Sequence, residues 1–282
     1  CAGLKSGVSR QRQLSSRRTK QRTQEVADID CAVEGSVATV TLNRPAVRNA
    51  MTLSMWKDVA RIFRELGEKR EVRAIIFTGA GGNFCAGADV SEFSSVRSNA
   101  RDSTDYEIAV DASSGAIAGV PQPVIAVIAG YCLGGGCHLS RACDFRFAHP
   151  TADLGIPAAN LSIIYGVRST KRLLALVGVT NAKRILYAAE RVCAHEAMRL
   201  GLVDRLSDDP VGDAQSFAAQ LAEKAPLSIA GAKYILNEAS MGESGSLAQA
   251  MIDRASDSED YREARSAFAE KMKVVRMAVT PM

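Results

Sequence analysis

The sequence predicts an α/β fold in which helices cover a β-sheet. Three observations support this prediction. In the first half of the chain, short segments rich in β-branched residues alternate with longer segments whose apolar residues recur at helical spacing. Two of the short segments run directly into glycine-rich turns. Beyond Gly166 the pattern is helical throughout, so the strands come first and the helices last.

Each expected element follows from its local pattern. Residues 37–42 alternate β-branched and small side chains and stop before Pro45, which predicts a strand followed by a turn. Residues 52–69 place apolar side chains at helical spacing after Thr52, a suitable N-cap, which predicts a helix. The other expected strands are 73–78, 123–129 and 143–148, and the other expected helices are 137–142, 168–177, 181–189, 194–200, 211–224, 228–240 and 247–273.

Composition restricts the class of protein. The chain has 282 residues, 47% apolar and 23% charged, which excludes disorder and small disulfide-stapled scaffolds. The longest uncharged apolar stretch, residues 123–137, is interrupted by glycines and too short to span a bilayer. Seven cysteines without a CxxC pair and three scattered histidines predict free thiols in a reducing cytoplasm and no bound metal.

Charge and pattern together divide the chain into three parts. Residues 1–24 hold seven Lys/Arg and no acidic residue, whereas the rest holds 28 basic and 31 acidic residues. We expect a basic, flexible leader at 1–30, an α/β core at 31–205 and a helical C-terminal region at 206–282. The leader is compatible with an organelle-targeting peptide, a nucleic-acid-binding arm or an extension without function.

Two glycine-rich turns, 81–89 and 130–138, are the most distinctive local feature. Small residues there allow the main chain to approach a ligand, and a helix start presents N–H groups that have no internal partner. Such groups suit an anion. Neither turn is a nucleotide-binding fingerprint, because no Gly-Lys-Ser/Thr follows and Leu139 stands where a dinucleotide motif needs glycine. Tight packing of strand against helix is the alternative explanation.

Ordered motifs across residues 32–275 resemble the crotonase (enoyl-CoA hydratase/isomerase) superfamily. The motifs are Asn43-Arg44-Pro45-x-x-Arg48-Asn49-Ala50-Met51, Phe84-x-Ala86-Gly87-Ala88-Asp89, Gly130-Tyr131-x-Leu133-Gly134-Gly135-Gly136-Cys137 and Cys143-Asp144. The resemblance implies a crotonase-like fold of repeated ββα units with a C-terminal helical trimerisation region. It also implies an acyl-CoA thioester as substrate, no separate cofactor, and a homotrimer or a dimer of trimers.

The same resemblance assigns expected site residues. It implies that the backbone N–H groups of Ala86 and Gly135 form an oxyanion hole for the thioester carbonyl. Charge develops on that oxygen during reaction, and main-chain donors would stabilise it. The residues expected to contact the substrate or its CoA part are Arg48 and Lys271 at the phosphates, Phe268 near the adenine, Ala86, Gly87, Ala88 and Asp89 along the adenine and pantetheine path, and Gly134, Ala158 and Asn160 in the rest of the site.

The sequence departs from the family pattern at two positions that are glutamates in the hydratases. His138 and Ala158 stand there instead. A mechanism with one carboxylic acid and one carboxylate base therefore cannot operate at these positions. His138 is the titratable group that remains, since it lies three residues after Gly135 on a helix and titrates near neutral pH when unperturbed. Tyr165 resembles a tyrosine of decarboxylase-type relatives and is the second expected catalytic side chain.

These observations predict an enzyme resembling the enoyl-CoA hydratases/isomerases that acts through an enolate stabilised by the oxyanion hole. Ordinary hydration is not expected because both glutamates are missing. The alternatives are an acyl-CoA decarboxylase or thioester hydrolase of the same fold, and a non-catalytic protein that binds acyl-CoA or RNA. Because the body of the chain is not basic, we do not expect nucleic acid to be a partner.

Overall fold

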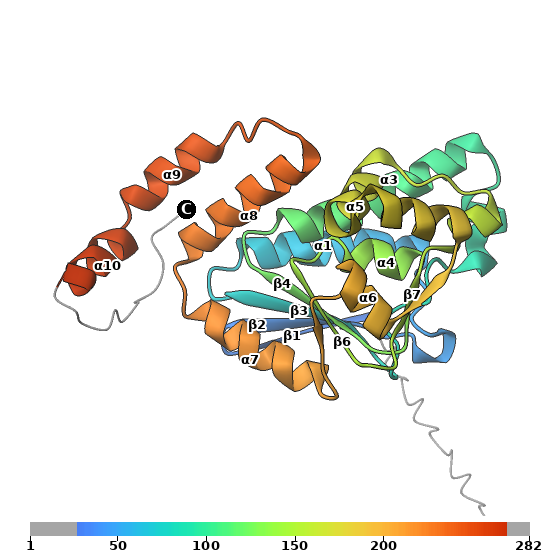
Figure 1. The fold of residues 1–282 in the computed structure, drawn as a ribbon, viewed down its shortest axis with the longest axis horizontal. Coiled ribbons are helices and arrows are strands. Elements are labelled where there is room, and N and C mark those ends of the chain that lie inside the picture. The colour runs from blue at the N-terminus through green and yellow to red at the C-terminus, as the bar shows by residue number, and fades with distance from the viewer. Residues whose placement is uncertain (1–26, 270–282) are drawn as a thin grey trace, which may run out of the picture.

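The structure, a computed structural model, describes residues 27–269 and contains two sheets (Figure 1). In the larger sheet β1 pairs antiparallel with β2, and all other neighbours are parallel. Its strands, in spatial order, are β1 (Ile29–Glu34), β2 (Val37–Leu42), β3 (Ala74–Gly79), β4 (Val124–Ile128), β6 (Phe145–Ala148) and β9 (Arg205–Leu206). The smaller sheet contains β5 (Tyr131–Leu133), β7 (Asp153–Gly155) and β8 (Arg191–Cys193).

Helices cover both faces of the larger sheet (Figure 1). Helices α1 (Leu53–Glu68) and α3 (Ala100–Gly119) pack against each other on one face. Trp56, Phe63 and Leu66 of α1 are almost fully buried there, because the apolar residues of this helix share one side. Helix α7 (Pro210–Ala222) covers the opposite face with Ala214 and Ala218. The core is therefore a layer of helices, a sheet and a second helical layer.

The remaining helices follow the sheet in sequence. Helix α8 lies beside the core, and helices α9 and α10 lie beyond it at one side of the molecule (Figure 1). The bounds are α2 (Phe93–Val96), α4 (Gly135–Ser140), α5 (Val167–Ala188, interrupted at Gly178), α6 (Ala194–Leu200), α8 (Pro226–Met241), α9 (Ala248–Ser256) and α10 (Glu259–Ala269), with short 3₁₀ turns η1 (Pro45–Val47), η2 (Val90–Glu92) and η3 (Pro157–Leu161). The predicted α/β class with a helical C-terminal region is confirmed.

Several expected boundaries need correction. Strand β1 starts at Ile29, inside the expected leader. Strand β9 straddles the expected end of the core, and α7 belongs to the core because it covers the sheet. The expected helix 247–273 is two helices separated at residues 257–258, and its last four residues lie outside the described part of the chain.

Helix α3 is the largest element that the sequence pattern missed. Its buried side includes Ser113 and Ser114 as well as apolar residues. Each serine hydroxyl donates to the carbonyl three residues earlier, Val110 and Asp111 respectively. Because these hydroxyls are satisfied within the helix, they can be buried, and the apolar periodicity used to recognise a helix is lost.

Candidate active site

The two glycine turns lie against each other. Cys85 forms a parallel bridge with Cys132, in which the Cys85 N–H donates to the Tyr131 carbonyl at 2.8 Å and the Leu133 N–H donates to the Cys85 carbonyl at 2.9 Å. A Cβ built on Gly136 would lie 2.4 Å from the Cys85 oxygen. Glycine is therefore required at 136 for the turns to approach this closely, and the approach brings residues 86–88 to the start of α4.

The prediction that the Ala86 N–H is a donor of the oxyanion hole is wrong. This N–H donates to the Arg48 carbonyl at 2.9 Å, so it is already occupied by the main chain. The N–H of Ala88 is the candidate donor instead. The Met51 N–H donates to the Gly87 carbonyl and the Asp89 N–H donates to the Met51 carbonyl, both at 2.8 Å. Since successive N–H groups of an extended segment point to opposite sides, the Ala88 N–H points away from Met51.

The Ala88 and Gly135 nitrogens lie together. A Cβ built on Gly135 would be 3.4 Å from the Ala88 nitrogen, and one built on Gly87 would be 3.6 Å from the Gly135 nitrogen. Within residues 27–269, neither N–H donates a hydrogen bond. Gly87 has a φ of +112°, which L side chains rarely adopt and which sets the direction of the following N–H. The structure thus holds two adjacent donors without acceptors.

Residues of the first sequence motif, 43–51, bind the segment 80–89 that carries the Ala88 donor. Asn49 is fully buried, and its Nδ2 donates to the carbonyls of Ala80 and Asn83. The Arg44 guanidinium binds Asp89 at 2.9 Å. Asp89 also accepts from the Ser91 hydroxyl and N–H, and these bonds, followed by Arg44, lower its pKa. Asp89 is therefore occupied by protein partners, which conflicts with the expected substrate contact.

A cavity of about 140 Å³ lies in front of the two donors. It is bordered by α1, α3, η3, α4 and the start of α5, and most of its wall is apolar or aromatic. Its predicted members are Ala86, Gly87, Ala88, Gly134, Gly135, His138, Ala158 and Tyr165, and its other polar or aromatic members are Trp56, Phe93, Arg97, Tyr106, Glu107, Asp111 and Ser169. Such a cavity with convergent polar groups is typical of a ligand site.

His138 is neutral and doubly hydrogen-bonded. Its Nε2 lies 3.3 Å from the Val110 carbonyl, which only accepts, so the hydrogen-bond network assigns the proton to Nε2. Nδ1 then accepts from the Ser169 hydroxyl at 2.9 Å. Burial, with the charges of Arg141 and Arg172, lowers the His138 pKa to about 3. The expected acid–base role conflicts with these contacts, because both nitrogens are occupied and the ring is a weak base.

The His138 pKa predicts a loss of stability in acid. The unfolded state binds a proton near pH 6.5, whereas the folded state does not, so the folded state is disfavoured as pH falls below 6.5. Between pH 7 and pH 5 this linkage costs about 2 kcal/mol. Urea unfolding of the wild type and His138→Gln at both pH values measures it. The variant should lose about 2 kcal/mol less than the wild type, and parallel losses would contradict the buried neutral ring.

Tyr165 lies in the cavity wall close to the second glycine turn. A Cβ built on Gly134 would be 3.8 Å from its hydroxyl. Burial raises the pKa of Tyr165, so the phenol stays protonated at neutral pH and can donate a hydrogen bond. Ala158 lies in the same wall and is buried. Asn160 is exposed and does not line the cavity, so the expected contact between Asn160 and substrate has no support here.

Among the expected CoA contacts, Arg48 lies outside the cavity wall, and Phe268 and Lys271 lie partly or wholly outside the described part of the structure. The Arg48 guanidinium stacks over the Tyr131 ring at 4.9 Å, outside the cavity wall. Arg48 and its neighbour Asn49 adopt positive φ, which turns the chain so that the Arg48 carbonyl receives Ala86. Phe268 lies in α10, but its side chain is outside the described part of the structure, and Lys271 lies beyond residue 269.

Sequence reasoning missed the contribution of α3. Tyr106, Glu107 and Asp111 all line the cavity from this helix. Trp56 of α1 lines it too, and its indole would contact a Cβ on Gly135 at 2.9 Å. The sequence did contain a signal for this helix face. Glu107 and Asp111 lie one helical turn apart, and Tyr106 and Val110 directly precede them.

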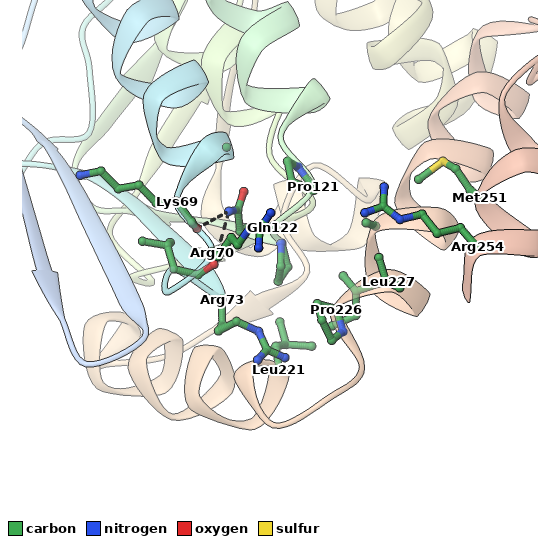
Figure 2. A pocket seen from close by; sticks show the side chains of 15 residues that line it. Lys69, Arg70, Arg73, Pro121, Gln122, Leu221, Pro226, Leu227, Met251 and Arg254 are labelled. Carbon is green, nitrogen blue, oxygen red and sulfur yellow. Dashed lines mark hydrogen bonds between the residues drawn. The ribbon is translucent and has the colours of Figure 1, made fainter. Parts of the chain in front are cut away.

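A second cavity of about 140 Å³ lies elsewhere, between the ends of α1 and α3 and the helices α7 to α9 (Figure 2). Four basic side chains surround it, namely Lys69, Arg70, Arg73 and Arg254. Gln122 closes one side by donating to the carbonyls of Leu66, Lys69 and Val72. Among the expected site residues whose side chains the structure describes, none borders this cavity, so we place the chemistry in the cavity in front of Ala88 and Gly135.

Comparisons with known proteins agree with the fold. The family model described as enoyl-CoA hydratase/isomerase matches residues 32–276. The chain is 34% identical over 245 residues to the putative enoyl-CoA hydratase/isomerase YngF of Bacillus subtilis, covering 85% of this chain and 94% of that protein. It is 32% identical to the short-chain-enoyl-CoA hydratase of Clostridium acetobutylicum, covering 89% and 97%.

A solved structure gives the same result. The putative enoyl-CoA hydratase/isomerase family protein from Hyphomonas neptunium superposes with a TM-score of 0.85 at 30% identity, covering 90% of this chain and 98% of that one. The fold and the site define a protein of the crotonase class. The chain belongs to the enoyl-CoA hydratase/isomerase family.

Residues 27–269 hold neither a membrane-spanning helix nor a metal-ligand cluster. No helix in that range is long and apolar enough to cross a membrane. In the same range, no three His, Cys, Asp or Glu side chains come together as metal ligands would.

Proposed function

We propose that this protein is an enzyme that converts an acyl-CoA thioester through an enolate whose oxygen is bound by the N–H groups of Ala88 and Gly135. The observation that carries the proposal is the pair of adjacent N–H groups without acceptors at a cavity wall. Preorganised donors of this kind stabilise the charge that develops on a thioester oxygen, and each is typically worth about 3 kcal/mol of barrier. Membership of the family supports a thioester as substrate.

The groups around the donors favour chemistry at the α-carbon over addition of water. His138 and Ala158 cannot provide the acid and base that would hold a water molecule across a double bond. The mostly apolar and aromatic wall suits an acyl chain. We therefore propose proton removal at the α-carbon, as in isomerisation, and propose that Arg48 and Lys271 contact the CoA phosphates.

Tyr165 favours decarboxylation as the second candidate. Its phenol is protonated at neutral pH and lies near Gly134, so it can donate a hydrogen bond to a carboxylate on the acyl group. Loss of carbon dioxide from such a substrate leaves the same enolate, and the same two N–H groups would stabilise it.

We also propose that copies of the chain associate through the C-terminal helices, as a trimer or a dimer of trimers. The support is a set of exposed large apolar side chains on and between α8 and α9, which in soluble proteins marks association surfaces. These are Ile235, Leu236, Leu247 and Ile252.

The six described cysteines are free, which fits the expected reducing cytoplasm.

Exchange of the α-protons of butyryl-CoA in D₂O, followed by proton NMR, tests the proposal. We expect exchange to depend on the enzyme, crotonyl-CoA to remain unhydrated, and acetoacetyl-CoA to bind as its enolate. Consumption of malonyl-CoA without exchange of butyryl-CoA would identify the decarboxylase instead. Binding of butyryl-CoA with neither reaction would show a non-catalytic acyl-CoA-binding protein, and absence of binding would overturn the site itself.

A further inference from the structure

The proposed chemistry needs a group that accepts a proton, and the cavity wall offers few. His138 has both nitrogens occupied. Tyr165 and Tyr106 stay protonated, since burial raises the pKa of both and brings that of Tyr106 to about 12. The carboxylates of Glu107 and Asp111 remain, one helical turn apart on α3 and both at the cavity wall.

Glu107 is held in position by a cation that is itself fixed. The Arg97 guanidinium, which follows α2, binds Glu107 at 2.9 Å with only 17% of its side chain exposed. Arg97 also stacks over the rings of Phe93 at 5.3 Å and Tyr106 at 4.9 Å. These contacts restrict the carboxylate while 40% of the Glu107 side chain remains accessible.

A chain of direct contacts connects this carboxylate to the two donors. Tyr106 precedes Glu107 in sequence, and the Arg97 guanidinium stacks over its ring. The Tyr106 hydroxyl accepts from the Trp56 indole N–H at 2.8 Å. The far edge of that indole lies against Gly135, where a Cβ would be 2.9 Å away. The carboxylate and the donors therefore belong to one packed wall, and a small shift of either would disturb the other.

We infer that Glu107 is the catalytic base that removes the α-proton of the bound thioester. The α C–H bond breaks, the proton moves to a Glu107 oxygen, and the electron pair forms the enolate, whose oxygen receives the N–H groups of Ala88 and Gly135. Return of the proton from Glu107 to carbon closes the cycle without a further reagent. This inference rests on the proposed function and adds its proton carrier.

Local charges adjust the basicity of Glu107. Burial raises its pKa, and Arg97 lowers it by a smaller amount. The titratable or charged groups near the carboxylate are Arg97 after α2, Tyr106 and Asp111 on α3, and Tyr165 after η3. A carboxylate with a raised pKa is a stronger base than an ordinary glutamate.

Glu107→Gln tests the inference without removing the shape of the side chain. We expect exchange of butyryl-CoA α-protons to fall by at least about 100-fold while butyryl-CoA affinity stays the same. Asp105→Asn changes an exposed carboxylate of the same helix that does not line the cavity, so it is the matched control and should keep the exchange. Retained exchange in Glu107→Gln, or its loss in Asp111→Asn alone, would overturn the inference but not the function; no exchange in the wild type would overturn both.

The pH profile separates a base from a residue that only supports the wall. The base must be ionised, so exchange should fall as pH drops through the Glu107 pKa. Arg97→Gln removes the cation that lowers this pKa, so the acid limb of the profile should move to higher pH. A lower rate at every pH with an unmoved limb would show that Glu107 only supports the wall, and would overturn the inference.

Discussion

Gly135→Ala is expected to lower enolate formation by about 100- to 1,000-fold, the effect of losing one oxyanion donor. The added Cβ would lie 2.9 Å from the Trp56 indole and 3.4 Å from the Ala88 nitrogen. It would therefore crowd the Ala88 N–H, which we propose binds the thioester oxygen. The rate of butyryl-CoA α-proton exchange, measured together with butyryl-CoA binding, gives the size of the effect.

Gly115→Ala is the matched control for this substitution. Gly115 lies in α3, and a Cβ built there meets no atom within 4 Å. The same chemical change should therefore leave exchange intact and stabilise the helix slightly, by up to about 1 kcal/mol. If Gly135→Ala folds and exchanges protons as fast as Gly115→Ala, the two N–H groups do not bind the reacting oxygen.

Lys233→Met is expected to destabilise the fold by about 3 kcal/mol, because it leaves a partly buried carboxylate without its cation. Lys233 lies in α8 and is 8% exposed. Its ammonium donates to Asp144 at 2.8 Å and to the Gln122 carbonyl at 2.9 Å. Asp144 in turn accepts the Val124 N–H at the start of β4, so this cluster fastens α8 to the sheet. Unfolding in urea at one protein concentration measures the loss.

Two companion variants show whether the ion pair is the cause. Lys57→Met changes an exposed lysine of α1 and should alter stability by no more than about 0.5 kcal/mol. Adding Asp144→Asn to Lys233→Met removes the stranded charge and should recover part of the loss, in the manner of a double-mutant cycle. A loss from Lys233→Met as small as that from Lys57→Met would mean that the cluster does not hold α8.

The position of the donors shows how far local patterns reach. The second glycine turn and a helix after it, at 137–142, were expected from the sequence. The structure contains both, but the helix begins two residues earlier, at Gly135. The first turn was placed correctly, but its donor was taken to be Ala86 instead of Ala88. Each is an alanine in the same short segment, and only the pairing with Arg48 and Met51, far away in sequence, decides which N–H is engaged.

His138 illustrates the same limit for chemistry. Its place three residues after Gly135 put it correctly at the cavity, and its unperturbed pKa suggested a proton carrier. Ser169, Val110 and two arginines surround it in the fold, and burial among them keeps it neutral. A pKa depends on neighbours in space, which the order of residues along the chain does not reveal.

By itself the sequence determined the alternation of strands and helices, the two glycine turns and the family, because these depend on side-chain periodicity and on glycine spacing within short segments. The tertiary structure decided which N–H groups lack acceptors, that α3 lines the cavity, and which ionisable groups remain to move a proton. Those properties arise where distant segments meet, since hydrogen-bond satisfaction and desolvation are set only when the chain is packed.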